Sequence, residues 1–258
     1  MPGALNALVK AWRSQRFAPG ARNVLQADSD AIESHATVEH HLSWMAFTGA
    51  SRFGAPDDSA FHLGLLPMPF LGNLRRACVF LVSLNPGLGP HDYFGEHHVT
   101  EYSEALLKNL RQDRDARFPF LDPAHAWHGG SAYWAPRLRG ITEGVQKGLK
   151  ISPRESRELC AEHIAVLELV PYHSGNFKLA RRGIDALEST NLVRNFVFGE
   201  LLPRHRSKDC KLIVLRSRDL WLRPNDKAAG FPAPAMPRNA RIADRDAKEA
   251  AAMICRYA

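Results

Sequence analysis

The chain has 258 residues, of which 45% are hydrophobic and 24% are charged, a composition typical of globular proteins with enough apolar side chains to build a core. No segment reaches the roughly 20 apolar residues of a membrane span, and the basic first 17 residues lack the apolar segment of a secretory signal. The net charge of +7 favours polyanionic partners, of which nucleic acid is the commonest.

The four cysteines are widely separated, and none forms a C-x-x-C pair. This pattern argues against a zinc ribbon or an iron–sulfur site and fits free thiols in a reducing cytoplasm. Histidines occur at positions 40–41, 97–98, 125 and 128, but their acidic neighbours do not have a recognised ligand spacing. We therefore expect a cytoplasmic, monomeric protein without metal or cofactor.

The first half of the chain begins with two predicted helices, over residues 4–15 and 29–47. Residues 49–69 are rich in Gly and Pro and are expected to be irregular. A strand follows over about residues 77–84, and a short amphipathic helix over residues 101–110. Residues 111–130 are polar and turn-rich, apart from the segment 118–121, and are expected to form a surface excursion.

The second half alternates helices and strands. A helix is predicted over residues 133–149, and the next begins at Ser152 with Pro153 and Glu155 in capping positions. Strands are expected over residues 164–170 and 212–215, separated by a helix over about residues 184–202. An ordered proline-rich loop over residues 224–237, a short strand over residues 240–243 and a helix from Asp244 to about Tyr257 complete the chain.

Strands that alternate with helices favour parallel pairing through right-handed crossovers. The sequence therefore predicts an α/β protein, specifically a three-layer α/β/α sandwich with a central, mostly parallel sheet of about four strands. We expect one domain over residues 1–258, with residues 1–66 as a helical extension packed on it. Three strand ends, near Asn85, Glu168 and Arg216, are then expected to meet along one edge of the sheet, where ligands bind in open α/β sheets.

The most informative segment is the apolar run of residues 79–84 that breaks into Asn85, Pro86 and Gly87. The run is typical of a strand that is buried on both faces. Pro86 cannot donate to a strand ladder and Gly87 permits a positive φ, so the strand must stop there. Asn85 is either a turn former after a core strand or a polar side chain at a ligand-binding edge.

After a buried strand, the sequence Leu84-Asn85-Pro86-Gly87 resembles the first motif of the uracil-DNA glycosylase superfamily. The mismatch-specific and single-strand-selective branches are the most similar. Residues 67–72 resemble the approach to that strand, and residues 168–171 match the second motif by position. Residues 215–220 stand in the place of the third motif, so the resemblance covers about residues 67–222.

The resemblance implies a chemistry and a set of roles. Such enzymes flip a damaged base into a tight pocket, and water then attacks the sugar as the base leaves. Asn85 matches the residue that positions this water, with Leu84, Pro86 and Gly87 beside it. Tyr93 or Phe94 would stack on the flipped base, unless the pair is ordinary core packing.

Two positions depart from the family pattern. The second motif has Glu168 in place of Asn: ionised, it only accepts hydrogen bonds, whereas a protonated Glu168 would donate and accept as Asn does. A third possibility is that Glu168 lies outside the pocket and pairs with an arginine. The third motif has Arg216 in place of His. An arginine is able to stabilise the departing base, but it is bulkier than histidine and permanently charged.

Other residues extend the expected DNA-binding surface. Leu220 and Trp221, flanked by Arg218 and Arg223, would form the loop that enters the minor groove, or they are core residues after a strand. His173 is a further candidate for the pocket. Basic residues are dense over positions 204–223 and at 181–182, and they form either a DNA surface or an ordinary solvated one.

The expected function is that of a DNA-base glycosylase, a hydrolase of N-glycosyl bonds in DNA repair, with a base preference altered from plain uracil. One alternative is a catalytically inactive module that binds nucleic acid or nucleotides on the same fold. Another is an enzyme for a small anionic substrate clamped by Arg216. The sequence contains no dinucleotide-binding, P-loop or nucleophile-elbow motif.

Overall fold

The computed structural model describes residues 3–223, 230–234 and 242–258. The fold is mixed α/β, as the sequence predicts. Within the described ranges, no helix is both long and apolar enough to cross a membrane. Residues 240–241 of the predicted strand and most of the predicted loop over residues 224–237 lie outside the described residues, and residues 242–243 are not in a strand.

Four strands form the larger sheet, in the order β3-β5-β4-β6. Their bounds are β3 (Phe70–Leu71), β4 (Val79–Ser83), β5 (Ile164–Glu168) and β6 (Lys211–Val214). β4 pairs in parallel with both β5 and β6, whereas β3 is antiparallel to β5 at the edge. All residues of β4, β5 and β6 are buried, which explains why these strands are continuous apolar runs in the sequence.

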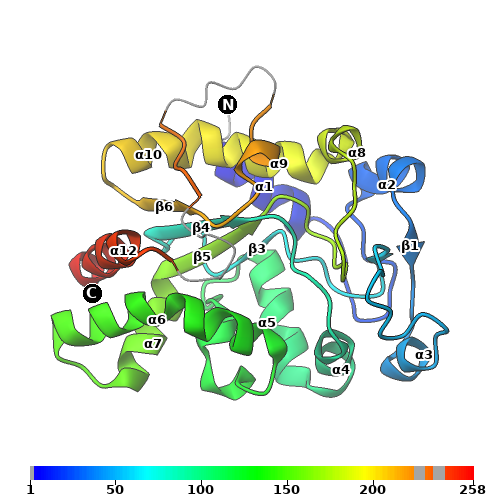
Figure 1. Ribbon diagram of the computed structural model, residues 1–258, viewed down its shortest axis with the longest axis horizontal. Helices are drawn as coiled ribbons and strands as arrows, with labels where there is room; N and C mark the ends of the chain where they lie inside the picture. The colour runs from blue at the N-terminus through cyan, green and yellow to red at the C-terminus, as the bar shows by residue number, and fades with distance from the viewer. Residues whose placement is uncertain (1–2, 224–229, 235–241) are drawn as a thin grey trace.

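Helices cover both faces of this sheet (Figure 1). α1, α9 and α10 lie over one face, and α5, α6 and α7 over the other. The helices are α1 (Ala4–Arg13), α2 (Ser29–His35), α3 (Trp44–Thr48), α4 (Pro90–His98), α5 (Thr100–Arg111), α6 (Gly129–Leu149), α7 (Pro153–His163), α8 (Arg181–Ala186), α9 (Glu188–Phe196), α10 (Leu202–Arg206), α11 (Arg218–Trp221) and α12 (Asp244–Tyr257).

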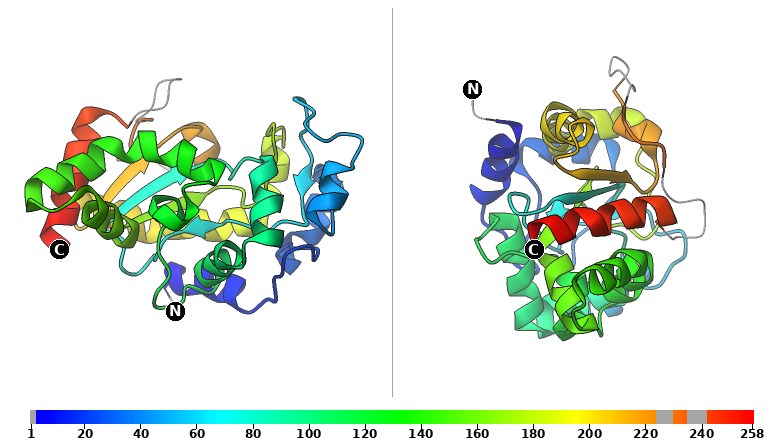
Figure 2. Two further views of the ribbon diagram at one scale, coloured as in Figure 1. Left: turned by 90° about the horizontal axis from the view of Figure 1, so that it is seen from below. Right: turned by 90° about the vertical axis from the view of Figure 1, so that its left-hand side faces the viewer.

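The C-terminal helix α12 packs closely along α6 (Figure 2). A Cβ atom at Gly144 would lie only 2.6 Å from the Cβ of Ala251, so glycine permits the close approach of the two helices. The start of α7 follows the predicted capping pattern: the Ser152 side chain accepts from the Glu155 N–H, and the Glu155 carboxylate accepts from the Ser152 N–H.

The predicted helix over residues 29–47 is wrong. The segment divides into α2, the two-residue strand β1 (Val38–Glu39) and α3. β1 pairs in parallel with β2 (Phe61–His62) in a separate small sheet. The helical spacing of apolar residues misled the prediction because the partner strand lies more than twenty residues further along the chain.

Two other segments differ from expectation. The predicted helix over residues 184–202 is a succession of α8, α9, a π-helical turn (Val197–Leu201) and α10. The predicted surface excursion over residues 111–130 contains two 3₁₀ turns, η2 (Pro119–Leu121) and η3 (Pro123–His125), and buries Phe118, Phe120 and Leu121 in the core. The hydrophobic effect holds this segment against the molecule, despite its polar composition.

Candidate functional site

Three polar side chains meet where the parallel strands end. In the pairing of β4 with β5, Ser83 is opposite Glu168. In the pairing of β4 with β6, Val82 is opposite Val214. Asn85 therefore follows the end of β4 by two residues, and Arg216 follows the end of β6 by two residues. As the sequence predicts, Asn85, Glu168 and Arg216 line one pocket.

The pocket has a volume of about 240 Å³. This is less than the roughly 300–1,000 Å³ of pockets for drug-sized ligands, so the pocket suits a smaller molecule. Its lining comes from β3, β4, β5, η2, α4, α6, the loop after β6 and neighbouring loops: Met68, Leu71, Ser83, Asn85, Pro86, Gly87, Leu88, His91, Asp92, Phe120, His128, Gly129, Gly130, Tyr133, Trp134, Glu168 and Arg216.

The side chain of Asn85 is buried and held in one orientation. Its Nδ2 donates to the hydroxyl of the buried Ser174 over 3.1 Å. No donor to Asn85 Oδ1 occurs among the described residues. Because Nδ2 is committed to Ser174, Oδ1 is the atom that remains to accept a hydrogen bond from a water molecule or a ligand.

The loop after Asn85 presents its backbone to the pocket. Gly87 has a φ of +76°, and a Cβ atom there would meet nothing within 4 Å. His173 does not line the pocket but lies behind this loop, with Nδ1 2.9 Å from the Gly87 carbonyl and Nε2 3.2 Å from the Leu66 carbonyl. Burial lowers the pKa of His173, and a neutral ring donates only one of these bonds. Leu84 is partly buried and also lies outside the lining.

Glu168 is 4% exposed, and its Oε2 has no hydrogen-bond partner among the described residues. Burial raises the pKa of Glu168 to about 8, although Ser83 and Arg216 act in the opposite direction. At neutral pH the protonated carboxylic acid therefore predominates. In this form Glu168 both donates and accepts a hydrogen bond.

Arg216 brings a positive charge to the mouth of the pocket. The residue is exposed, and in the part of the chain that the structure describes it has no hydrogen-bond or ion-pair partner. Ser217, next to it, has a left-handed backbone conformation with a φ of +56°. An unpaired guanidinium beside a buried pocket is suited to bind an anion or a developing negative charge.

Sequence reasoning did not place His91, Asp92 and His128 in the pocket, but all three line it. Asp92 Oδ2 accepts from the Gly89 N–H over 2.6 Å, and Oδ1 lies 3.4 Å from His128 Nε2. Burial alone would raise the pKa of Asp92, but His128, His173 and His91 hold it below its ordinary value. Asp92 is therefore a carboxylate at neutral pH.

These three residues bring their ligand atoms within 4.8 Å of one another, which raises the question of a metal. However, His128 Nδ1 accepts from the Gly130 N–H over 2.9 Å, so the proton of a neutral ring lies on Nε2. Nε2 is the nitrogen that faces Asp92. Although Nε2 and Asp92 Oδ1 are 3.4 Å apart, His128 Nε2 has no hydrogen-bond partner among the described residues, and Asp92 Oδ2 is already bonded to the Gly89 N–H.

The aromatic wall of the pocket differs from the prediction. Phe120, Tyr133 and Trp134 line it. Tyr93 is instead buried outside the lining and stacks on Phe47 with ring centroids 4.3 Å apart. Phe94 is 41% exposed and contacts Trp127 edge-on, with ring centroids 6.0 Å apart. The apolar segment 118–121 within a polar region was the signal in the sequence that could have indicated burial of Phe120.

The loop in the place of the third motif forms the short helix α11. Trp221 is fully buried and donates from Nε1 to the Ser83 carbonyl over 2.9 Å, so it is a core residue and is not available at the surface as a wedge. Leu220 is partly buried. Arg218 donates to the carbonyls of Phe231 and Pro232. Arg223 donates to the Asn195 side chain.

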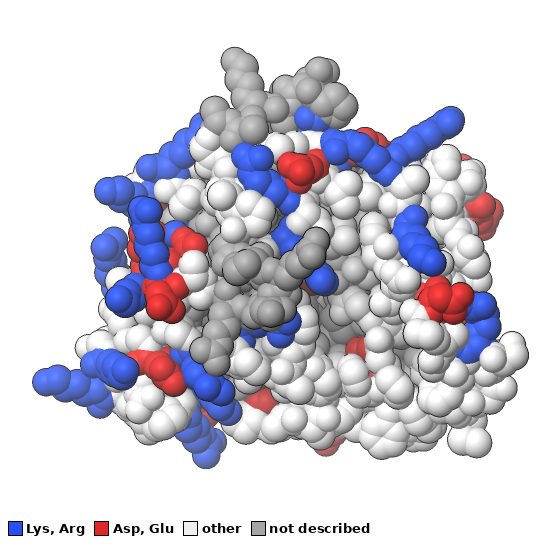
Figure 3. Space-filling view, viewed as in Figure 1, with Lys and Arg blue, Asp and Glu red and all other residues white. Residues whose placement is uncertain are grey.

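Positive charge is unevenly distributed over the molecule. On the face shown in Figure 3, Lys and Arg side chains gather at the top and left, whereas the lower right carries few charges. Part of the basic cluster over residues 204–223 has structural partners: Lys211, for example, lies 2.6 Å from Asp246 and 2.5 Å from Glu249. Not every basic residue of this cluster is therefore available to contact a polyanion.

Comparison of the chain with protein-family models, with curated proteins and with solved structures found no match. The candidate site therefore rests on the geometry of the pocket and on the motifs in the sequence.

Proposed function

We propose that the protein is a DNA-base glycosylase-like hydrolase of the uracil-DNA glycosylase superfamily, a monomer that acts on DNA in the cytoplasm. On this proposal the molecule is one three-layer α/β/α domain with a central, mostly parallel sheet. The observation that carries the proposal is that Asn85, Glu168 and Arg216 line one pocket of about 240 Å³.

Each of the three residues has a role that its surroundings support. Asn85, fixed by Ser174, would orient the attacking water through Oδ1. Protonated Glu168 would donate to a carbonyl oxygen of the flipped base and accept from the adjacent N–H. Arg216 would stabilise the negative charge on the departing base.

The protonation of Glu168 narrows the expected substrate. A group that both donates and accepts fits an edge on which a carbonyl lies beside an N–H. Uracil, hypoxanthine and xanthine have such an edge, and a protonated Glu168, unlike an ionised one, would not repel their carbonyl oxygen. Tyr133 and Trp134 line the same pocket and would contact the faces of the base. Asp92, ionised and in the same pocket, is available to accept a proton from the water.

An excision assay tests the proposal. Single- and double-stranded oligonucleotides with uracil, hypoxanthine, xanthine or a mismatch are incubated with the folded protein, and abasic sites are measured. We expect excision of at least one of these bases. Absence of abasic product on every substrate would contradict the proposal, and salt-dependent binding without excision would favour the alternative of an inactive binding module.

The role of Asn85 has its own test. Asn85→Ala removes the group that orients the water, so excision should fall by at least about 100-fold, the cost expected for misplaced reactants. Asn6→Ala is the matched control, because Asn6 is exposed on α1 and outside the pocket. Equal rates for the two variants would remove Asn85 from the mechanism.

A further inference from the structure

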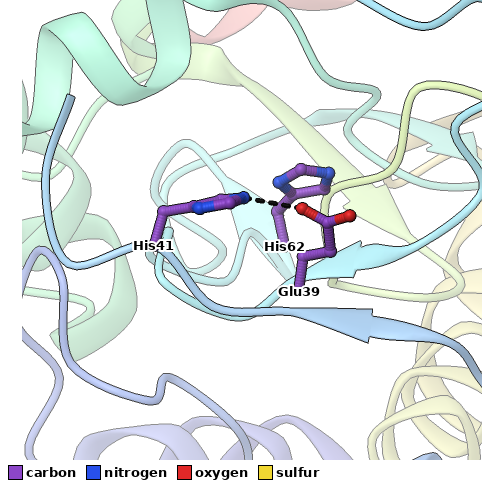
Figure 4. Close-up of side chains that lie close together, drawn as sticks. All are labelled: Glu39, His41 and His62. Carbon is purple, nitrogen blue, oxygen red and sulfur yellow. Dashed lines mark hydrogen bonds and ion pairs between the residues drawn. The ribbon is translucent and has the colours of Figure 1, made fainter. Parts of the chain in front are cut away.

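A second group of ligating side chains lies at the small sheet, away from the pocket. Glu39 of β1 and His62 of β2 are opposed in the parallel register, and His41 follows Glu39 by two residues. One ligand atom from each of these three side chains lies within 4.8 Å of the others. Figure 4 shows the three side chains converging from β1, β2 and the loop that follows β1.

The backbone fixes this arrangement. Phe61 N–H donates to the Thr37 carbonyl, and Leu63 N–H donates to the Glu39 carbonyl, each over 2.9 Å. These bonds on either side of His62 hold it against Glu39. The convergence therefore follows from strand pairing as well as from the rotamers of long side chains.

The hydrogen bonds of His62 orient its ring for metal ligation. Its Nε2 lies 2.9 Å from Oδ2 of the buried Asp58, so the proton of a neutral ring points at that carboxylate. Nδ1 then accepts from the Tyr93 hydroxyl over 3.3 Å, and a metal ion bound at Nδ1 would replace this hydrogen bond. A carboxylate that orients a histidine from behind is the usual outer-shell partner of metal-binding histidines.

His41 and Glu39 complete the set. His41 Nε2 lies 2.7 Å from Glu39 Oε2, and the two side chains are 14% and 22% exposed. A metal ion would take the place of the proton that these atoms share. The partial exposure leaves a route by which an ion and a water ligand can reach the group.

We propose that Glu39, His41 and His62 form a zinc-binding site, with water as the fourth ligand. Two imidazoles and a carboxylate are a donor set that Zn²⁺ accepts in tetrahedral geometry. Mg²⁺ and Ca²⁺ prefer all-oxygen ligands, so the two histidines disfavour them. This inference is independent of the proposed glycosylase activity.

The position of the site indicates what the ion would do. The His62 N–H donates to the His173 carbonyl over 3.0 Å, and His173 Nδ1 contacts the carbonyl of Gly87. Zinc would thus link β1 and the loop after it to β2, which is itself bonded to the residues behind the Asn85 loop. Bound zinc should therefore stabilise the folded protein.

Zinc titration of the metal-stripped full chain, followed by calorimetry, tests the site. We expect the wild type to bind one zinc ion, and both Glu39→Gln and His41→Gln to bind it at least about 10-fold more weakly. His40→Gln is the matched control: His40 contacts the Gly20 carbonyl and is not part of the group, so binding should be unchanged. Equal zinc affinity in all four proteins, or no binding to the folded wild type, would overturn the proposal.

Two further measurements separate a specific site from loss of folding. Asp58→Asn keeps the ligands but weakens the orientation of His62, and should reduce zinc affinity by about 10–100-fold. Circular dichroism of each metal-free variant establishes that it is folded. Cobalt(II) in the wild type should give the visible absorption of a tetrahedral site, and its persistence in His41→Gln would place the ion elsewhere and contradict the assignment.

Discussion

The proton on Glu168 is the feature of a single residue that most affects the proposed chemistry. Glu168 is opposed to Ser83 at the end of the sheet, almost fully buried, and has an unpartnered Oε2. A buried carboxylate without a close partner is costly, so the group keeps its proton to a much higher pH than a solvated glutamate.

This proton makes stability depend on pH. Between the ordinary value of 4.5 and about 8, the folded protein holds a proton on Glu168 that the unfolded chain has lost. The contribution of Glu168 to the free energy of unfolding should therefore fall by about 1.4 kcal/mol per pH unit as pH rises through this window. Glu168→Gln cannot ionise, so urea denaturation should show a shallower decrease for the variant. Parallel profiles for the two proteins would contradict the raised pKa.

The same proton should control base recognition. Above about pH 8 the wild-type Glu168 becomes an acceptor only, and excision of a base with a carbonyl beside an N–H should decline. Glu168→Gln keeps a donor and an acceptor at every pH, so its excision rate should not show this decline. The measurement is the rate of abasic-site formation from pH 6 to pH 9 with each protein. A decline of equal size in both would assign the titration to another group.

The sequence predicts some residues of the pocket and misses others for a definite reason. The sequence predicts Asn85, Glu168 and Arg216 as pocket residues because each directly follows or ends a buried apolar run. Asp92 and Tyr93 are adjacent in the sequence, yet α4 directs one into the pocket and the other against Phe47. That choice depends on how α4 packs, which local sequence does not reveal.

At the level of elements, arginines clamp the loop that carries Arg216 and α11. Arg194 is 1% exposed, pairs with Asp185 over 2.7 Å and donates to the Leu220 carbonyl. Arg181 donates to the carbonyls of Asp219 and Leu222. In the sequence, the basic pair at positions 181–182 suggested a DNA surface. In the structure, Arg181 of this pair holds the loop that carries α11 in place.

Removal of the clamp should destabilise the protein. Arg194→Ala breaks two hydrogen bonds of a charged donor and leaves a cavity, so the free energy of unfolding should fall by about 2–4 kcal/mol. Arg182→Ala, at an exposed position of α8, is the control and should change it by less than about 0.5 kcal/mol. Urea denaturation measures both. A similar, small effect of the two substitutions would show that Arg194 is not a structural residue.

Elements were predictable where a local signal was strong. β4, β5 and β6 are apolar runs, and those of β4 and β5 are soon followed by proline, while the start of α7 has a complete capping box. β1, β2 and β3 contain two residues each and exist only through pairing with distant partners. Periodicity within a window cannot detect such pairing, so the segment over residues 29–47 was misassigned as one helix.

For the whole molecule, the proposed function raises the question of which cationic side chains would contact DNA. Lys211 and Arg194 are engaged in ion pairs, and Arg218 and Arg223 donate to neighbouring loops or helices. Arg216 differs from them, because it has no such partner in the described part of the chain and lines the pocket. If Arg216 contacts the base, its effect on catalysis and its effect on DNA affinity are separable.

Salt titration of DNA binding makes this separation. Each phosphate contact contributes about −0.9 to the slope of log K against log salt concentration. Arg216→Ala should leave the slope unchanged while excision falls, because a base contact releases no phosphate counterion. Arg256→Ala, at the exposed end of α12, is the control and should alter neither quantity. A slope reduced by about 1 in Arg216→Ala would instead place Arg216 on the DNA backbone, and the stabilisation of the departing base would then have to come from another residue of the pocket.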